Sequence, residues 1–151
     1  MRLEVAVCLP HESETVAVVR TVVTHALGSF GVRPDCVDDI GLALSEACAN
    51  VVIHAADDDE YEVRVQIDER RCVVSVRNTG HGFDASALRD EMPDALSPSG
   101  RGVAIMRAVM DDVAFTSEPS TGTIVRLVKD LALVPDGTLA RLLRRRGDSL
   151  G

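Results

Sequence analysis

The sequence predicts an α+β fold, a two-layer sandwich in which a mixed, mostly antiparallel sheet carries its helices on one face. Short segments in which apolar and polar residues alternate, the pattern of half-buried strands, occur at the start of the chain and in two later pairs. Segments with apolar residues at helical spacing lie between them. Strands and helices cluster without strict alternation, which favours this class over a parallel α/β fold.

The chain begins with a predicted strand over residues 2–9, in which every second residue is aliphatic. Pro10 ends this strand, and Ser13 has the character of a helix N-cap. Aliphatic residues then recur at helical spacing, and Gly28 and Gly31 mark the end of the first helix.

A second helix is predicted from Pro34 to about Ala56, with a continuous apolar stripe. Residues 61–67 alternate clearly between apolar and polar side chains, and residues 72–76 form a returning strand after a tight turn at 69–71. The two strands together predict a hairpin.

The periodicity disappears between residues 78 and 102, and a loop of this length in a compact domain is usually functional. A short helix follows over residues 103–110, and residues 113–117 and 123–129 predict a final hairpin. We assign residues 1–131 to one domain.

The 151 residues fit a single domain, and an aromatic content of 3% implies an aliphatic core. Residues 132–151 are expected to be a flexible tail, whose leucines could form a short amphipathic turn but would more readily fray. Four cysteines, without any CxxC pair, are interpreted as small buried hydrophobes in a reducing compartment: Cys8, Cys36, Cys48 and Cys72.

Charge and apolar patterning exclude several classes of function. A net charge of −8 makes the chain a poor ligand for the phosphate backbone of nucleic acids. No apolar run approaches the ~20 residues of a membrane span, and the N-terminus lacks a signal-peptide pattern. We therefore expect a cytoplasmic protein with no nucleic-acid or membrane partner. Its acidic surface suits a basic partner, or serves solubility alone.

Four short motifs carry the chemistry. Glu46 and Asn50 lie four residues apart on the second helix and so share one face, although such a pair is often simply solvated. In the segment 78–83, Gly80 and Gly82 would let the backbone approach a ligand closely.

The third motif, Gly100-Arg101-Gly102, opens a helix, where free backbone N–H groups bind anions. The fourth, Thr121-Gly122-Thr123, begins the last strand. In this order, the four motifs resemble the N, G1, G2 and G3 boxes of the GHKL superfamily of ATP-binding domains, also called the Bergerat fold. The resemblance covers residues 2–130, and the Glu-Ala-x-x-Asn form is similar to the anti-sigma-factor serine/threonine kinase branch.

This resemblance implies an ATP-dependent serine/threonine protein kinase that acts as an anti-sigma factor. Members of that branch sequester a sigma factor and phosphorylate an anti-anti-sigma partner of the STAS type. The resemblance also implies a homodimer, for which the mostly aliphatic first strand and first helix are the candidate interface.

The resemblance assigns roles to individual residues. Asn50 resembles the magnesium ligand, and Glu46 resembles the general base that takes the proton of the attacking hydroxyl. Gly80 and Gly82 would shape the nucleotide pocket. Thr123 would support the adenine end.

The resemblance implies that the phosphates of ATP or ADP would be bound by Gly100, Arg101, Gly102 and Val103. A lid spanning about residues 84–99 would cover them. Arg101 would add charge there, or it is an ordinary exposed arginine.

The chain departs from the family pattern at Asn78, where the family normally has an aspartate that accepts a hydrogen bond from the adenine amino group. An amide can still accept that bond and donate to ring N1. The charge is lost, however, at a cost of about 1 kcal/mol, which corresponds to roughly tenfold in affinity. Asn78 could also face guanine, so base selectivity stays open.

The lost carboxylate also favours a second function, a nucleotide-sensing regulatory module with weak or no kinase activity. Two further classes of protein fit less well. A histidine-kinase fragment would need an upstream pair of dimerisation helices, and a topoisomerase- or chaperone-type ATPase would need a following transducer domain.

Overall fold

A computed structural model describes residues 1–54, 60–78, 98–118 and 122–149. Its elements follow one another in the order β1 (Arg2–Pro10), α1 (Ser13–Ser29), α2 (Pro34–His54), β2 (Glu60–Asp68), β3 (Arg71–Asn78), α4 (Pro98–Val109), β4 (Asp112–Glu118), β5 (Gly122–Asp130) and α5 (Thr138–Ser149).

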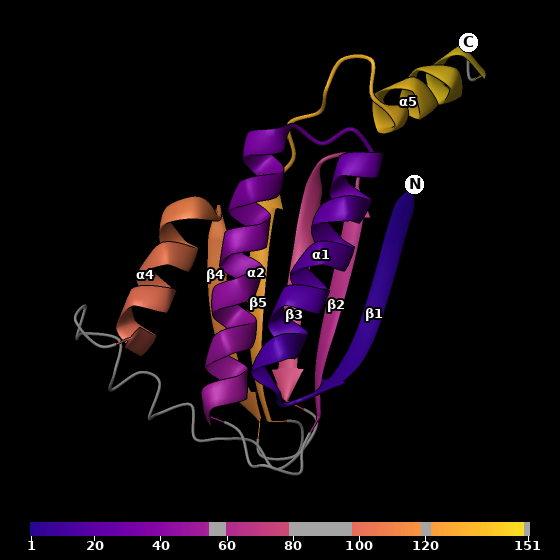
Figure 1. The fold of residues 1–151 in the computed structure, drawn as a ribbon. Helices are drawn as coiled ribbons and strands as arrows, with labels where there is room; N and C mark the ends of the chain where they lie inside the picture. Colours follow the sequence, from indigo (N-terminus) through magenta and orange to yellow (C-terminus); the bar gives the residue numbers. More distant parts are fainter. Residues whose placement is uncertain (55–59, 79–97, 119–121, 150–151) are drawn as a thin grey trace.

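The five strands form one sheet in the order β1-β2-β3-β5-β4. Helices α1, α2 and α4 lie side by side on one face of this sheet, which gives two layers (Figure 1). The α+β sandwich expected from the sequence is therefore confirmed. Every pairing between the described strands is antiparallel, so the expected parallel component is not found among them.

The period-two pattern of the strands places their apolar side chains under the helices. In β2, the four residues that face the helices are fully or almost fully buried: Tyr61, Val63, Val65 and Ile67. The residues between them are exposed or half-buried on the open face, where Arg64 bridges Glu4 and Glu62 at 3.2 and 3.3 Å. The core between the layers is mostly aliphatic, as the composition predicted.

The start of α1 differs from the expectation. Ser13 is the first helical residue, and Glu12 occupies the N-cap position with an extended backbone and no side-chain cap. The Thr15 hydroxyl instead donates to the Glu12 carbonyl at 2.6 Å. The end of α1 was predicted well: Gly31 adopts a φ of +83°, a left-handed conformation that suits glycine.

The C-terminal segment, expected to fray, contains a helix. Its first turn is held to the end of α1, because the Leu139 amide donates to the Phe30 carbonyl at 2.9 Å and the Leu139 side chain is fully buried. The connection is tight: a Cβ on Gly31 would lie 2.7 Å from the Gly137 Cα. The burial of Leu139 is a tertiary contact that local patterning of the segment did not indicate.

Three of the four cysteines are buried, as expected, and burial raises the pKa of the Cys48 and Cys72 thiols to about 12. The interpretation of Cys8 as buried was wrong. Cys8 lies on the open face of β1, exposed, with its sulfur 3.9 Å from a carboxylate oxygen of Glu62.

Among the helices of the described residues, none is both long enough and apolar enough to cross a membrane. The labelled chain ends lie at the same end of the molecule, beside the ends of α1 and α2 that are joined by the short connection around Gly31 (Figure 1).

Candidate functional site

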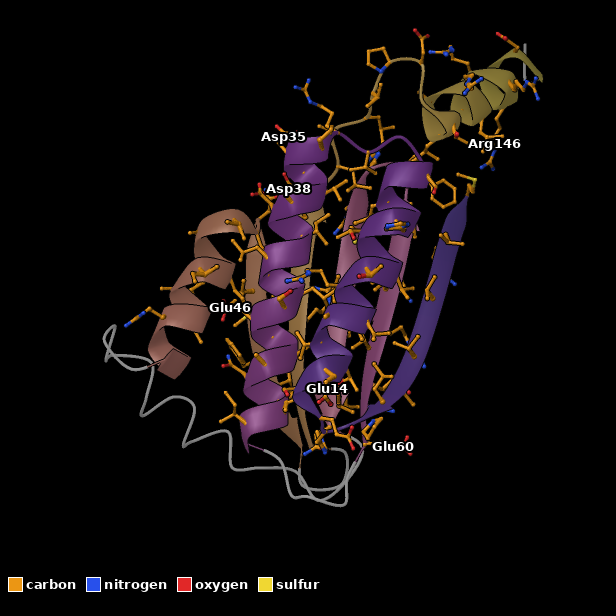
Figure 2. All side chains as sticks on the ribbon, viewed as in Figure 1. Glu14, Asp35, Asp38, Glu46, Glu60 and Arg146 are labelled. Atoms are coloured by element: carbon orange, nitrogen blue, oxygen red, sulfur yellow. The ribbon has the colours of Figure 1, made fainter. Side chains whose placement is uncertain are left out.

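The first and third motifs meet where α2 packs against α4. Glu46 lies on the side of α2 that faces α4 (Figure 2). A Cβ placed on Gly102 would lie 2.9 Å from Glu46 Oε2 and 3.5 Å from both side-chain amide atoms of Asn50. The carboxylate, the amide and the backbone of α4 therefore form one cluster, and residue 102 has no room for a side chain without displacing Glu46.

Asn50 is a buried polar residue of this cluster. Its side chain is only 5% exposed, and its Nδ2 has no hydrogen-bond partner in the described part of the chain. Leaving a buried donor without a partner costs about 1–3 kcal/mol, which a bound group can recover. An amide also offers an oxygen to a hard cation such as Mg²⁺, so the donor set fits the magnesium that the resemblance implies.

The beginning of α4 supplies backbone donors beside this cluster. Pro98 opens the helix, where its missing N–H is no loss, and Gly100 and Arg101 follow in the first turn. The first N–H groups of a helix lack partners within the helix and favour anions. Arg101 is exposed, whereas the Val103 side chain packs in the core, so only the Val103 backbone is available to a phosphate.

The predicted adenine end lies on the two central strands. Asn78 is the last residue of β3, fully buried, and pairs with Tyr61 of β2. Arg77 pairs with Ile124, so the backbones of Asn78 and Thr123 lie one residue beyond that pair on adjacent strands. The side chain of Thr123, like Gly80, Gly82 and the proposed lid up to residue 97, lies outside the described residues.

Two supporting contacts were not predicted from the sequence. Tyr61 stacks on His11 with ring centroids 5.6 Å apart, and its hydroxyl lies 2.5 Å from that of Thr15. This group braces the strand position beside Asn78. The alternation of β2 indicated that Tyr61 is buried, but no local pattern indicated its partners.

The second contact ties the far end of α4 to the sheet. The Lys129 ammonium group donates to Asp39 Oδ2 at 3.1 Å and to the Val109 carbonyl at 2.5 Å. It thereby joins β5, α2 and the last turn of α4 at one point. No sequence signal pairs these residues, because they come from three separate segments.

Residues 9–129 match the family of histidine kinase-like ATPase domains. The chain belongs to this family. A protein named serine-protein kinase RsbW from Bacillus velezensis is 32% identical over 134 residues, 82% of each chain. RsbW from Bacillus licheniformis is 32% identical over 143 residues, 85% of this chain and 88% of its own. RsbW from Bacillus subtilis is 29% identical over 134 residues, 82% of each.

Solved structures share the fold. The crystal structure of the RsbU and RsbW domains of Rv1364c from Mycobacterium tuberculosis matches 85% of this chain with a TM-score of 0.61 and 19% identity, over 32% of that longer chain. A chain of the SiaB–SiaC complex from Pseudomonas aeruginosa matches this protein with a TM-score of 0.61 and 14% identity. The match covers 83% of this chain and 88% of that chain.

These findings confirm the resemblance to the GHKL superfamily and to its serine-kinase branch. They make nucleotide use a property of the family to which the chain belongs. The matched range 9–129 contains all four motifs, so the cluster at Glu46, Asn50 and Gly102 lies inside the ATPase domain.

Proposed function

We propose that this protein is an ATP-dependent serine/threonine protein kinase and anti-sigma factor. It would phosphorylate a STAS-type anti-anti-sigma protein and sequester a sigma factor. The observation that carries this proposal is the packing of Glu46 and Asn50 against Gly102, which places a carboxylate and a ligand-ready amide beside the start of α4. The serine-protein kinase names of the relatives support the reaction class.

In this proposal each group has one task. Asn50 would hold Mg²⁺ through its amide oxygen, and such an ion would supply positive charge to offset that of the phosphates. The free N–H groups at the start of α4 hold the phosphate oxygens. Glu46 would accept the proton of the serine or threonine hydroxyl. The hydroxyl oxygen would bond to the γ-phosphorus of ATP while the bond between that phosphorus and ADP breaks.

The remaining assignments extend this proposal. Asn78, Gly80, Gly82 and Thr123 would bind the nucleoside. A homodimer would use β1 and α1, because Val18 and Val22 of α1 are 55% and 43% exposed and Val22 borders an apolar groove that reaches β1. The protein would act in the cytoplasm.

A nucleotide-sensing module with weak or no kinase activity is the second candidate, and Asn78 is the observation that favours it. The amide is fully buried where the family has a charged acceptor. A neutral group is easier to bury than a carboxylate, but it binds the adenine amino group less strongly.

Phosphoryl transfer separates the two candidates. We expect the parent protein with Mg-ATP to phosphorylate a STAS-domain protein of the same organism. Glu46→Gln should lower the transfer rate by roughly 10²–10⁴ while ATP affinity stays within a few-fold. Asn50→Ala should weaken metal-dependent ATP binding as well. ATP binding by the parent without transfer to any STAS-domain protein would favour the sensing module.

A further inference from the structure

The outer side of α2 exposes large aliphatic side chains on both sides of Glu46. Leu42 is 44% exposed and Ile53 is 67% exposed. Residues at positions i, i+4, i+7 and i+11 share one face of a helix, so Leu42, Glu46, Ala49 and Ile53 form a single line. We call these four residues the α2 stripe. The proposed general base therefore lies within an exposed apolar surface.

The chemistry requires the acceptor to cover this surface. A general base works within about 2.6–3.2 Å of the proton that it removes, directly or through one water. The acceptor hydroxyl belongs to a folded protein, so the surface around its serine or threonine must approach the helix face around Glu46. The exposed side chains one turn before and two turns after Glu46 are Leu42 and Ile53.

Arginines flank the stripe on both sides. On α1, Arg20 lies with its Nη1 3.5 Å from Ser45 Oγ of α2. On α4, Arg101 is exposed and is the neighbour of Gly102, which packs against Glu46. Within the described residues, neither arginine forms a salt bridge to a carboxylate. The chain as a whole has a net charge of −8, so two cations without such a bridge stand out on this surface. They favour a partner whose contact surface has carboxylates at its rim.

We propose that the α2 stripe is the docking surface for the phosphoacceptor protein. The partner presents its serine or threonine on an apolar patch with carboxylates at its edge. This inference rests on the proposed kinase function and adds to it the surface that selects the substrate. Leu42 and Ile53 set the KM for the acceptor without taking part in the chemistry.

Matched aspartate substitutions test the docking surface. The probe is the STAS-domain protein of the same organism that the parent phosphorylates fastest. Leu42→Asp and Ile53→Asp should each raise the KM for this acceptor about tenfold or more, with kcat at saturation and the Kd for Mg-ATP within about threefold. The control is Leu142→Asp on α5, which changes a leucine of similar exposure, 40%, away from the stripe. It should leave KM unchanged.

Further variants make the test independent of folding and address the rim. Leu42→Ser and Ile53→Ser should raise KM by a smaller factor, with thermal unfolding at the parent temperature. Arg20→Glu should raise KM more at low than at high salt, because opposite charges at a rim are screened by ions.

Several outcomes would overturn the inference. Transfer with a KM within about twofold of the parent in both aspartate variants would show that the acceptor docks elsewhere, while the kinase function stands. Dissociation of a parent dimer by these variants, seen by light scattering, would make the stripe a contact between copies of this chain. Absence of transfer by the parent to every STAS-domain protein would refute the kinase function itself, and the inference with it.

Discussion

At the scale of single residues, the site depends on a glycine that the sequence alone could not single out. The third motif contains two glycines, Gly100 and Gly102, and the sequence gives both the same expected role. The packing of α4 on α2 shows that Gly102 lies against Glu46 and Asn50. The spacing of Glu46 and Asn50 could be predicted, because four residues make one helical turn. Their neighbour on another helix could not.

Gly102→Ala should reduce catalysis far more than stability. The added methyl group would lie 2.9 Å from Glu46 Oε2, and a flexible carboxylate can move aside at small cost. The displaced base should lower phosphoryl transfer by about tenfold or more, while the melting temperature falls by only a few degrees. Gly147→Ala on α5, where no atom lies within 4 Å of the added Cβ, is the control. Full activity of Gly102→Ala would mean that the contact with residue 102 does not position Glu46 for catalysis.

Asn78→Asp should tighten ATP binding by about tenfold, because a charged acceptor replaces a neutral one opposite the adenine amino group. Calorimetry with ATP and with GTP measures both affinity and base selectivity. The variant should also discriminate more strongly against GTP, since a carboxylate cannot donate to the guanine O6. An unchanged ATP affinity would show that the buried amide already satisfies the base.

At the scale of elements, α4 is fastened at its far end by Lys129, whose contacts to Asp39 and the Val109 carbonyl we call the Lys129 clamp. In the proposed function, the first turn of α4 would face the nucleotide. The short helix itself was predictable from its apolar spacing. Its start was placed at the third motif, Gly100-Arg101-Gly102, and the observed helix begins two residues earlier, at Pro98, because residues 98–102 carry no apolar period that would mark the boundary. The strands were predicted within a residue or two, since period-two alternation records directly which face the helices cover.

Lys129→Met should destabilise the protein by about 1–2 kcal/mol, because it removes both an ion pair to Asp39 and a donor to the last carbonyl of α4. Urea unfolding gives the free energy. Arg107→Met removes the cation that belongs to the last turn of α4 itself, and it serves as the control because Arg107 is exposed. An equal loss in both variants would assign the effect to the charge near the helix end rather than to the clamp.

The β2–β3 hairpin should weaken in acid. Hydrogen bonds from the Arg70 and Arg71 amides, at 2.7 and 2.8 Å, hold the pKa of Asp68 below its ordinary value. The stabilisation is therefore present above the unfolded pKa of about 3.9 and is lost as pH falls through the folded pKa. Urea unfolding of the parent and of Asp68→Asn across this range should show a smaller acid loss in the variant. Parallel curves would contradict the prediction.

At the scale of the whole molecule, three helices cover one face of an antiparallel sheet, and the other face carries charged side chains such as Arg64 together with aliphatic ones such as Val73 and Val128. This layering followed from the pattern and order of the elements, whereas the family was inferred from the resemblance of the four motifs and confirmed by the match over residues 9–129. The position of α5 did not follow, because a leucine-arginine segment has the same local pattern whether it frays or packs. The burial of Leu139 decides the matter, and that depends on Phe30 and Gly31 at a distant point of the chain.

Leu139→Ala should therefore cost about 2–3 kcal/mol of unfolding free energy, as for other fully buried leucines. Leu142→Ala, in the same helix but 40% exposed, should cost less than about 0.5 kcal/mol. Denaturant unfolding of both variants compares them directly. Equal stability of the two would mean that α5 contributes nothing to the fold and that residues 132–151 behave as the flexible tail that their local pattern predicts.

The start of β1 and helix α5 lie at one end of the molecule, while Glu46 lies part-way along α2 on the side facing α4 (Figures 1 and 2). An anchor attached at this end would leave the helix face around Glu46 free at the side of the molecule. The protein can therefore be immobilised on a sensor chip, or carry a fluorophore, through either terminus without shielding the surface where nucleotide and acceptor would meet.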